Sequence, residues 1–154
     1  MPAAKKRSPD EPIDYSLLPD LLGYHLRLTQ LAVFKDFSEA VEDPQITPSL
    51  YAVLVVIGAN PGLKQTELAR AVRLDRSSVV SVIDKLEKRK LVKRQRVEGD
   101  RRTNALALTD TGQLLLDELT TRVQAHEAHL SENLSDRERA TLIRLLGRIL
   151  PESR

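Results

Sequence analysis

Basic side chains and short hydroxyl side chains gather in one stretch of this sequence. Residues 70–102 hold twelve Lys or Arg against five Asp or Glu, a net charge of +7. The whole chain of 154 residues has a formal charge of only +2, so the remaining residues carry −5. Such a concentration of positive charge is a footprint for phosphate groups. A solvated surface with no partner is the alternative that charge alone leaves open.

Other residue types exclude several kinds of chemistry. The chain has no Cys, which excludes disulfides, thiolate metal sites and thiol nucleophiles and is consistent with a cytoplasmic protein. With three His, no Gly-rich phosphate loop and no Ser–His–carboxylate set, we expect neither an enzyme nor a cofactor. His126 and His129 are spaced as a helical metal pair, but the sequence offers no clear third ligand.

Neither a membrane span nor a signal peptide is expected. The longest apolar stretch, around 51–57, is far shorter than the roughly 20 residues that a membrane helix needs. Lys5, Lys6 and Arg7 are not followed by an apolar segment, and three prolines lie nearby. We therefore expect residues 1–14 to form a disordered basic tail.

The elements before the basic stretch are predicted to be helical. Residues 17–41 form a helix that is apolar nearly all round, which requires more than one neighbour and suggests a partner subunit. Thr47 and Pro48 are an N-cap and a first helical residue, so a helix follows through Ile57. A buried strand is the competing interpretation, because this segment is rich in β-branched residues.

Two short helices, a hairpin and two further helices follow. The short helices cover about 65–72 and 76–88, and Asp75 is the N-cap of the second. Strands are predicted over 92–97 and 103–108, with a hairpin turn at 98–101. Thr109 caps a helix that extends to about residue 131, and a capping box formed by Ser135 and Glu138 begins the last helix.

This order of elements is that of a winged helix-turn-helix. The second short helix would enter the major groove of duplex DNA, and the basic hairpin would reach the flanking minor groove. None of the five aromatic residues lies in the basic stretch, which argues against the base-stacking platforms of single-strand and RNA binders. The predicted fold is mainly α with a small β-hairpin wing, combining a winged helix-turn-helix lobe with a helical dimerisation region.

Several motifs resemble the MarR-type winged-helix transcriptional regulators. The stretch Asp100-Arg101-Arg102-Thr103-Asn104-Ala105-Leu106-Ala107-Leu108-Thr109 is similar to the family's wing signature, and Asp110-Thr111-Gly112 to its continuation. Residues 65–69 and 75–79 resemble the two helix-turn-helix elements. The chain departs from the family at Lys64, where a Ser or Thr N-cap is common, and it lacks the Cys that peroxide sensors use.

The resemblance implies a DNA-binding surface in which Arg102 enters the minor groove and Asp100 orients it. Together with the polar and basic residues of the second short helix and the hairpin, the expected DNA-binding residues are Lys64, Arg76, Ser77, Ser78, Ser81, Lys85, Lys88, Arg94, Arg96, Asp100, Arg101 and Arg102. The resemblance also implies a homodimer on a pseudo-palindromic operator. Residues 15–45 and 110–154 would form the dimerisation region, and residues 46–109 the DNA-binding lobe.

The resemblance further implies a small-molecule effector that releases DNA, and repression as the mode of regulation. A run from His25 to Phe37 is similar to the branch that controls aromatic-acid breakdown, whose effectors are aromatic acids or their coenzyme A thioesters. The expected ligand-binding residues are Leu22, His25, Leu28, Tyr51, Leu54 and Arg73. A metal-responsive or a ligand-independent winged-helix DNA-binding protein is the alternative.

Overall fold

The structure is a computed structural model that describes residue 8, residues 11–97 and residues 100–150, with the backbone alone for 96, 97 and 100–104. The chain divides into two units, residues 1–33 and 34–154, each described here by itself. The boundary falls within the helix α1 (Leu22–Val41).

In the first unit a short 3-10 helix, η1 (Leu18–Asp20), precedes the first part of α1. The predicted single helix from residue 17 is therefore wrong at its start, because Pro19 lies in the 3-10 turn and α1 begins only at Leu22. His25 in α1 is bonded to η1, since one of its ring nitrogens lies 2.7 Å from the carbonyl oxygen of Pro19. Apolar side chains of the unit are exposed to solvent at Leu17, Leu18, Leu21, Leu22, Leu26, Leu28 and Leu31.

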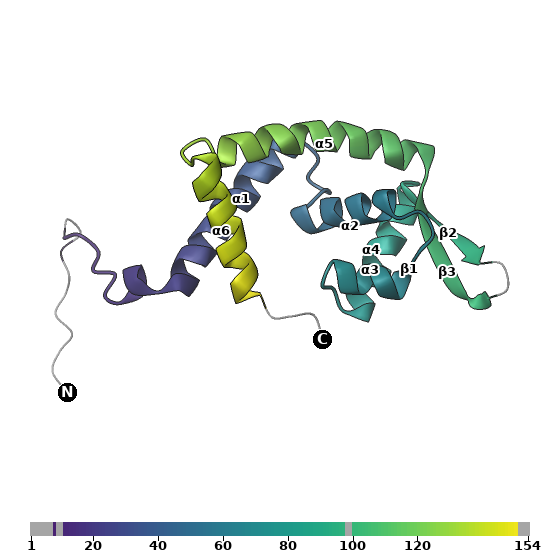
Figure 1. Ribbon diagram of the computed structural model, residues 1–154, viewed down its shortest axis with the longest axis horizontal. Helices are drawn as coiled ribbons and strands as arrows, with labels where there is room; N and C mark the ends of the chain where they lie inside the picture. Colours follow the sequence, from purple (N-terminus) through teal and green to yellow (C-terminus); the bar gives the residue numbers. More distant parts are fainter. Residues whose placement is uncertain (1–7, 9–10, 98–99, 151–154) are drawn as a thin grey trace. The chain divides into compact units, whose positions relative to one another are not determined.

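The second unit contains the predicted helices and wing (Figure 1). Its elements are the end of α1, α2 (Pro48–Ala59), β1 (Leu63–Lys64), α3 (Gln65–Ala71), α4 (Arg76–Lys88), β2 (Val92–Val97), β3 (Asp100–Leu108), α5 (Asp110–Leu130) and α6 (Asp136–Ile149). Thr47 caps α2 by accepting the Leu50 N–H, which supports the helix over the alternative strand. Figure 1 shows α5 lying along α2, while β2 and β3 project as a hairpin beyond α4.

The sheet has three antiparallel strands in the order β1-β3-β2. Strand β3 begins at Asp100, which pairs with Val97, so the predicted turn over 98–101 is wrong in its second half. Residues 98 and 99 lie outside the described residues. The two-residue strand β1, which pairs with Ala105 and Leu106, was not predicted because it is too short to leave an alternating pattern.

One hydrophobic core holds these elements together. Its fully buried side chains come from α2, α3, α4, β3 and α5, namely Val53, Leu54, Ile57, Leu68, Val79, Ile83, Leu86, Leu106 and Leu119. Helix α6 is different, because none of its residues is buried although its capping box is formed. No helix among the described residues is long and apolar enough to cross a bilayer.

The base of the wing meets the start of α5 at a close backbone contact. The Leu91 carbonyl oxygen accepts the Thr109 N–H at 3.0 Å, and Thr109 Oγ1 in turn accepts the Gly112 N–H. A Cβ on Gly112 would lie 1.9 Å from the Leu91 carbonyl oxygen. Only glycine therefore fits this position without moving the backbone of the wing.

Replacing Gly112 by Ala should destabilise the protein strongly. The added methyl group meets a backbone carbonyl that cannot rotate away, so we expect the upper end of the about 1–3 kcal/mol that overpacking costs. The measurement is the free energy of unfolding in urea. Gly147→Ala in α6 is the matched control, because among the described residues no atom outside its own helix backbone and chain neighbours lies within 4 Å of the new Cβ. It should stabilise the helix by about 0.5–1 kcal/mol. Equal effects of the two substitutions would contradict the assigned contact.

Candidate nucleic-acid interface

Helix α4 buries one face and exposes the other. Val79, Ile83 and Leu86 are buried in the core, whereas Ser77 and Ser81 are exposed and Ser78 is partly exposed. Because residues three and four apart share a helix face, the buried set fixes the direction of the exposed set. The serines predicted to face DNA therefore lie on the solvent side of α4.

Asp75 organises the N-terminal end of α4. Its Oδ1 accepts the Ser78 N–H at 2.8 Å and the Ser77 hydroxyl at 2.6 Å, and its Oδ2 accepts the Ser78 hydroxyl at 2.6 Å. The two hydroxyls and then the backbone amide hold the pKa of Asp75 well below its ordinary value of 3.8. Since a carboxylate only accepts hydrogen bonds, both serines donate their protons to Asp75 and present oxygen lone pairs outward.

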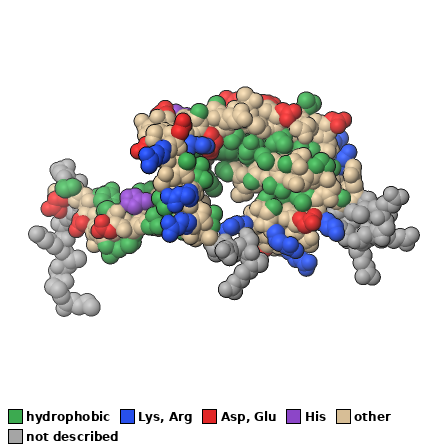
Figure 2. Space-filling view, viewed as in Figure 1, with side chains coloured by type: hydrophobic (Ala, Val, Ile, Leu, Met, Phe, Trp, Pro, Cys, Tyr) green, Lys and Arg blue, Asp and Glu red, His purple; other side chains and the backbone are tan. Residues whose placement is uncertain are grey.

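Most cations of the basic stretch are exposed. Of the nine whose side chains the structure describes, seven lie on the surface: Arg70, Arg73, Arg76, Lys85, Lys88, Lys90 and Lys93. Figure 2 shows Lys and Arg side chains along the edge of the lobe that α3 and α4 form. Three of the seven exposed cations, Arg76, Lys85 and Lys88, are predicted DNA contacts. Lys93 was missed, although strand alternation with the buried Val92 would have identified it as exposed.

Two other cations are committed to contacts inside the lobe. Arg94 Nη2 lies 2.8 Å from Asp84 Oδ1, and Arg94 Nη1 binds Glu87 Oε2. Arg89 Nη2 lies 2.7 Å from Asp43 Oδ2. Arg94 lies two residues after the buried Val92 in β2, so both side chains lie on the face of the strand that meets α4. The predicted DNA contact of Arg94 stays a prediction, and the structure shows its guanidinium bound to two carboxylates. Asp84 is likewise occupied by an ion pair.

Lys64 precedes α3 and is exposed. Its side chain cannot accept a hydrogen bond, so Lys64 does not supply the N-cap acceptor that a Ser or Thr would. Glu67, however, accepts the Lys64 backbone N–H at 2.8 Å, which supplies the other half of a capping box. The helix start is thus better satisfied than the sequence alone indicated.

The predicted wing residues lie mostly outside the described side chains. Arg96, Asp100, Arg101 and Arg102 are placed in β2 and β3 by their backbone alone. The expected orientation of Arg102 by Asp100 therefore stays a prediction.

The predicted ligand-binding residues fall in both units. In the first unit Leu22, His25 and Leu28 are exposed. In the second, Leu54 is fully buried in the core, which leaves it no surface for a ligand, and Arg73 is exposed.

Tyr51 belongs to a partly buried aromatic cluster of the second unit. Its hydroxyl lies 3.4 Å from Thr120 Oγ1, and its ring is 6.3 Å from that of Phe37. Phe37 also makes an edge contact with the His126 ring at 5.7 Å. This cluster joins the end of α1, α2 and the middle and second half of α5.

Arg73 occupies a left-handed backbone position at the end of α3, with φ 53°. The Arg73 N–H bonds to the Arg70 carbonyl oxygen and the Leu74 N–H to that of Ala69, which together form a Schellman motif. Glycine is the usual residue at this position, because it has no Cβ to strain. Arg73 is therefore an exposed residue in a left-handed conformation that glycine would adopt with less strain.

The two histidines of α5 do not share a metal site. His126 is buried, with Nε2 3.3 Å from Asp36 Oδ2, whereas His129 is exposed and lies 3.2 Å from Glu132. Among residues 11–97 and 100–150, no group of three potential His or carboxylate ligands is placed to hold a metal ion.

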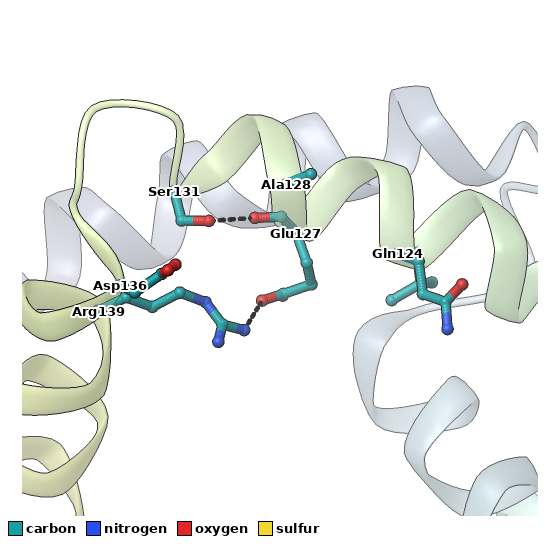
Figure 3. Close-up of a pocket in the computed structure, with 7 residues that line it drawn as sticks. Gln124, Glu127, Ala128, Ser131, Asp136 and Arg139 are labelled. Carbon is teal, nitrogen blue, oxygen red and sulfur yellow. Dashed lines mark hydrogen bonds and ion pairs between the residues drawn. The ribbon is translucent and has the colours of Figure 1, made fainter.

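A polar pocket of about 430 Å³ lies between α5 and α6 (Figure 3). Glu127 and Arg139 face one another across it, with Glu127 Oε2 3.8 Å from Arg139 Nη2, and Asp136 adds a second carboxylate. Two carboxylates against one guanidinium do not suit an aromatic acid. A smaller pocket of about 370 Å³ is lined by Gln45, Leu50, Lys85, Leu86, Lys88 and Arg89.

Comparison with known proteins agrees with this arrangement. The model of the MarR family matches residues 45–103. A putative transcriptional regulatory protein for the hcr operon of Thauera aromatica is 42% identical over 129 residues, which cover 83% of this chain and 78% of that protein. The chain belongs to the MarR family.

Solved structures of MarR-family regulators are similar over most of the chain. The transcriptional repressor CouR bound to a 23-mer DNA duplex matches with a TM-score of 0.85 and 38% identity, over 90% of this chain and 99% of that one. CouR bound to p-coumaroyl-CoA gives 0.83 and 37%, over 92% and 99%. The PcaV regulator from Streptomyces coelicolor with its natural ligand gives 0.81 and 29%, over 90% and 96%.

Without the Asp75 carboxylate, the free energy of unfolding of this MarR-family chain should depend less on pH in the acid range. Because the folded-state pKa of Asp75 is depressed, its contribution is present above the unfolded value of 3.8 and is lost as the pH falls through the folded value. Asp75→Asn keeps an N-cap but does not titrate. In urea unfolding between pH 5 and pH 2, its free energy of unfolding should fall less steeply than that of the wild type.

Asp75→Ala is the control for the cap itself. It removes the acceptor and should lower stability at pH 7 more than Asp75→Asn, which keeps an acceptor and loses only the contribution of the ionised carboxylate. Parallel acid limbs for Asp75→Asn and the wild type would contradict the assigned hydrogen bonds.

Proposed function

We propose that this chain is a transcriptional repressor that binds a pseudo-palindromic duplex operator as a homodimer and is released by an aromatic acid or its coenzyme A thioester. One observation carries the proposal. CouR, similar over nine-tenths of this chain, has been solved both on a DNA duplex and with p-coumaroyl-CoA. The same scaffold therefore supports both binding events, and we assign no enzymatic step to it.

The DNA-binding role rests on α4 and its surroundings. A polar, non-basic helix tip at Ser77 and Ser78 suits contact with base edges, and the exposed Lys85, Lys88 and Lys93 suit the phosphate backbone. A binder that reads no sequence would not need a serine tip flanked by cations. We extend the DNA-binding lobe over residues 46–109.

Dimerisation rests on the exposed apolar surface of the outer helices. Helix α6 has 14 residues and buries none of them, and helices of this length are marginal in water without tertiary packing. Leu142, Ile143, Leu145 and Ile149 are exposed on α6, and Leu28 and Leu31 on α1. A second copy would cover these side chains, which supports residues 15–45 and 110–154 as the dimerisation region.

The effector role rests on the aromatic cluster around Tyr51 and on exposed cations of the same unit. An aromatic ring suits the environment of Tyr51 and Phe37, and a thioester would also need cations for its phosphates. Arg73 is exposed and can supply one such cation. The ligand residues proposed for the first unit, Leu22, His25 and Leu28, stay predictions.

Substitution of Asp75 should change which bases the protein selects. In the wild type both serines present lone pairs, which match the amino groups of adenine and cytosine in the major groove. An Asn amide can donate to a serine oxygen and turn its proton outward. In selection from a randomised duplex pool, Asp75→Asn should therefore shift the preference at the contacted base toward guanine or thymine.

Ser81→Ala is the control for this selection, because Ser81 lies on the same face of α4 but makes no bond to Asp75. It should leave the position read by the Asp75-linked serines unchanged. If Asp75→Asn binds DNA with the preferences of the wild type, Ser77 and Ser78 do not read bases through their lone pairs.

A coenzyme A thioester should stabilise the protein and release it from DNA. p-Coumaroyl-CoA, free p-coumarate, free coenzyme A and Zn²⁺ are compared by thermal shift and by release of a labelled operator. A ligand at about 100 times its Kd adds about 2.7 kcal/mol of stability. Arg73→Gly should keep or raise the Tm, because glycine favours this φ, yet weaken the response to the thioester more than to the free acid. A shift with Zn²⁺ alone would contradict the aromatic effector.

A further inference from the structure

Arg94 joins the wing to α4 through two carboxylates. Its guanidinium contacts Asp84 at 2.8 Å and also Glu87, which lies three residues further along α4. Glu87 Oε1 accepts the Arg94 backbone N–H at 3.1 Å as well. The side chain of Arg94 is only 22% exposed and that of Glu87 30%. Both the backbone N–H and the side chain of Arg94 in β2 are thus bonded to the same face of α4.

The place of Arg94 in the sheet makes this tie important. Strand β1 pairs only with Ala105 and Leu106, and Arg94 is the partner of Leu106 across the hairpin. Beyond Arg94 the wing is a two-stranded ribbon, which by itself is marginal. The link from α4 to β2 is three residues long. It fixes where β2 begins, but it does not fix the direction in which the two-stranded ribbon extends beyond Arg94.

A basic residue in a DNA-binding wing suggests a phosphate contact, but the geometry points elsewhere. The guanidinium is shared between two carboxylates, and this fork is a contact that Lys cannot reproduce. Lys93, the neighbouring residue of the same strand, is exposed and lies on the opposite face. The two adjacent basic residues therefore have different roles.

We propose that Arg94 is a positioning residue that fixes the wing against α4, so that the major groove and the flanking minor groove are read together. The proposal rests on the DNA-binding function proposed above. Arg94 acts through Asp84 and Glu87 and does not itself contact DNA. Its removal leaves the bases read by α4 unchanged but loosens the wing, which loses selectivity for the flanking bases.

The test measures core and flank selectivity separately. Wild type, Arg94→Lys, Asp84→Asn/Glu87→Gln and the control Lys93→Gln are used to select duplexes from a pool with randomised cores and flanks. Affinity for the selected duplex is then measured at several salt concentrations. Circular dichroism and the Tm establish that each variant is folded, and Arg94→Lys is chosen because it keeps the charge.

Arg94→Lys should lose flank selectivity and at least about tenfold in affinity, the size of one lost base contact, while keeping core selectivity. The Asp84→Asn/Glu87→Gln variant should show the same loss although it removes two negative charges. Lys93→Gln should weaken binding to all sequences and lower the salt slope by about one contact.

The opposite pattern would overturn the proposal. If Arg94 binds phosphate, Lys at that position retains affinity and flank selectivity, and freeing it from Asp84 and Glu87 tightens binding. A wild type that selects no sequence at all would instead contradict the proposed function. Should Arg94→Lys fail to fold, the Asp84→Asn/Glu87→Gln variant decides between the two roles by the sign of its effect.

Discussion

The contact between Leu91 and the start of α5 is the constraint on which the rest of the lobe depends. Leu91 ends the link from α4 to β2, and its carbonyl oxygen accepts the Thr109 N–H where β3 leads into α5. Gly112 lets the backbones approach within a distance that a Cβ would forbid. One junction therefore connects the proposed recognition helix, both ends of the wing and the helix proposed for dimerisation.

The charge of the basic stretch is divided between two roles because of this arrangement. Arg89 and Arg94 neutralise carboxylates and hold α4 against its neighbours, through Asp43 in one case and Asp84 and Glu87 in the other. Burial opposes ionisation of Asp43, yet the bonds from Arg89 and from the Gln45 N–H outweigh it and lower its pKa. The exposed cations are left to meet an external anion, so the total of twelve Lys and Arg residues overstates the number of cations free for phosphate.

Local chemistry made the helices predictable, and long-range pairing decided what was missed. Caps at Thr47, Asp75 and Thr109 involve residues three apart in sequence, so they are visible in the sequence itself. Strand β1 exists only because Ala105 and Leu106 lie beside it, forty residues away. Arg94 was assigned to DNA from its charge, whereas strand alternation with the buried Val92 turns it inward. Likewise, Leu54 is apolar, as a residue in a pocket wall would be, but it packs in the core.

The junction at Leu91 would let the proposed effector act on DNA binding without touching α4. The Tyr51 hydroxyl lies beside Thr120 on α5, and Phe37 packs against His126 on the same helix. A ligand among these side chains must move α5 or the end of α1, because the cluster is already in contact. Since Gly112 fixes the start of α5 to Leu91, such a movement strains the base of the wing. A contact that admits no added methyl group also admits little sliding, and that rigidity is what would carry the signal.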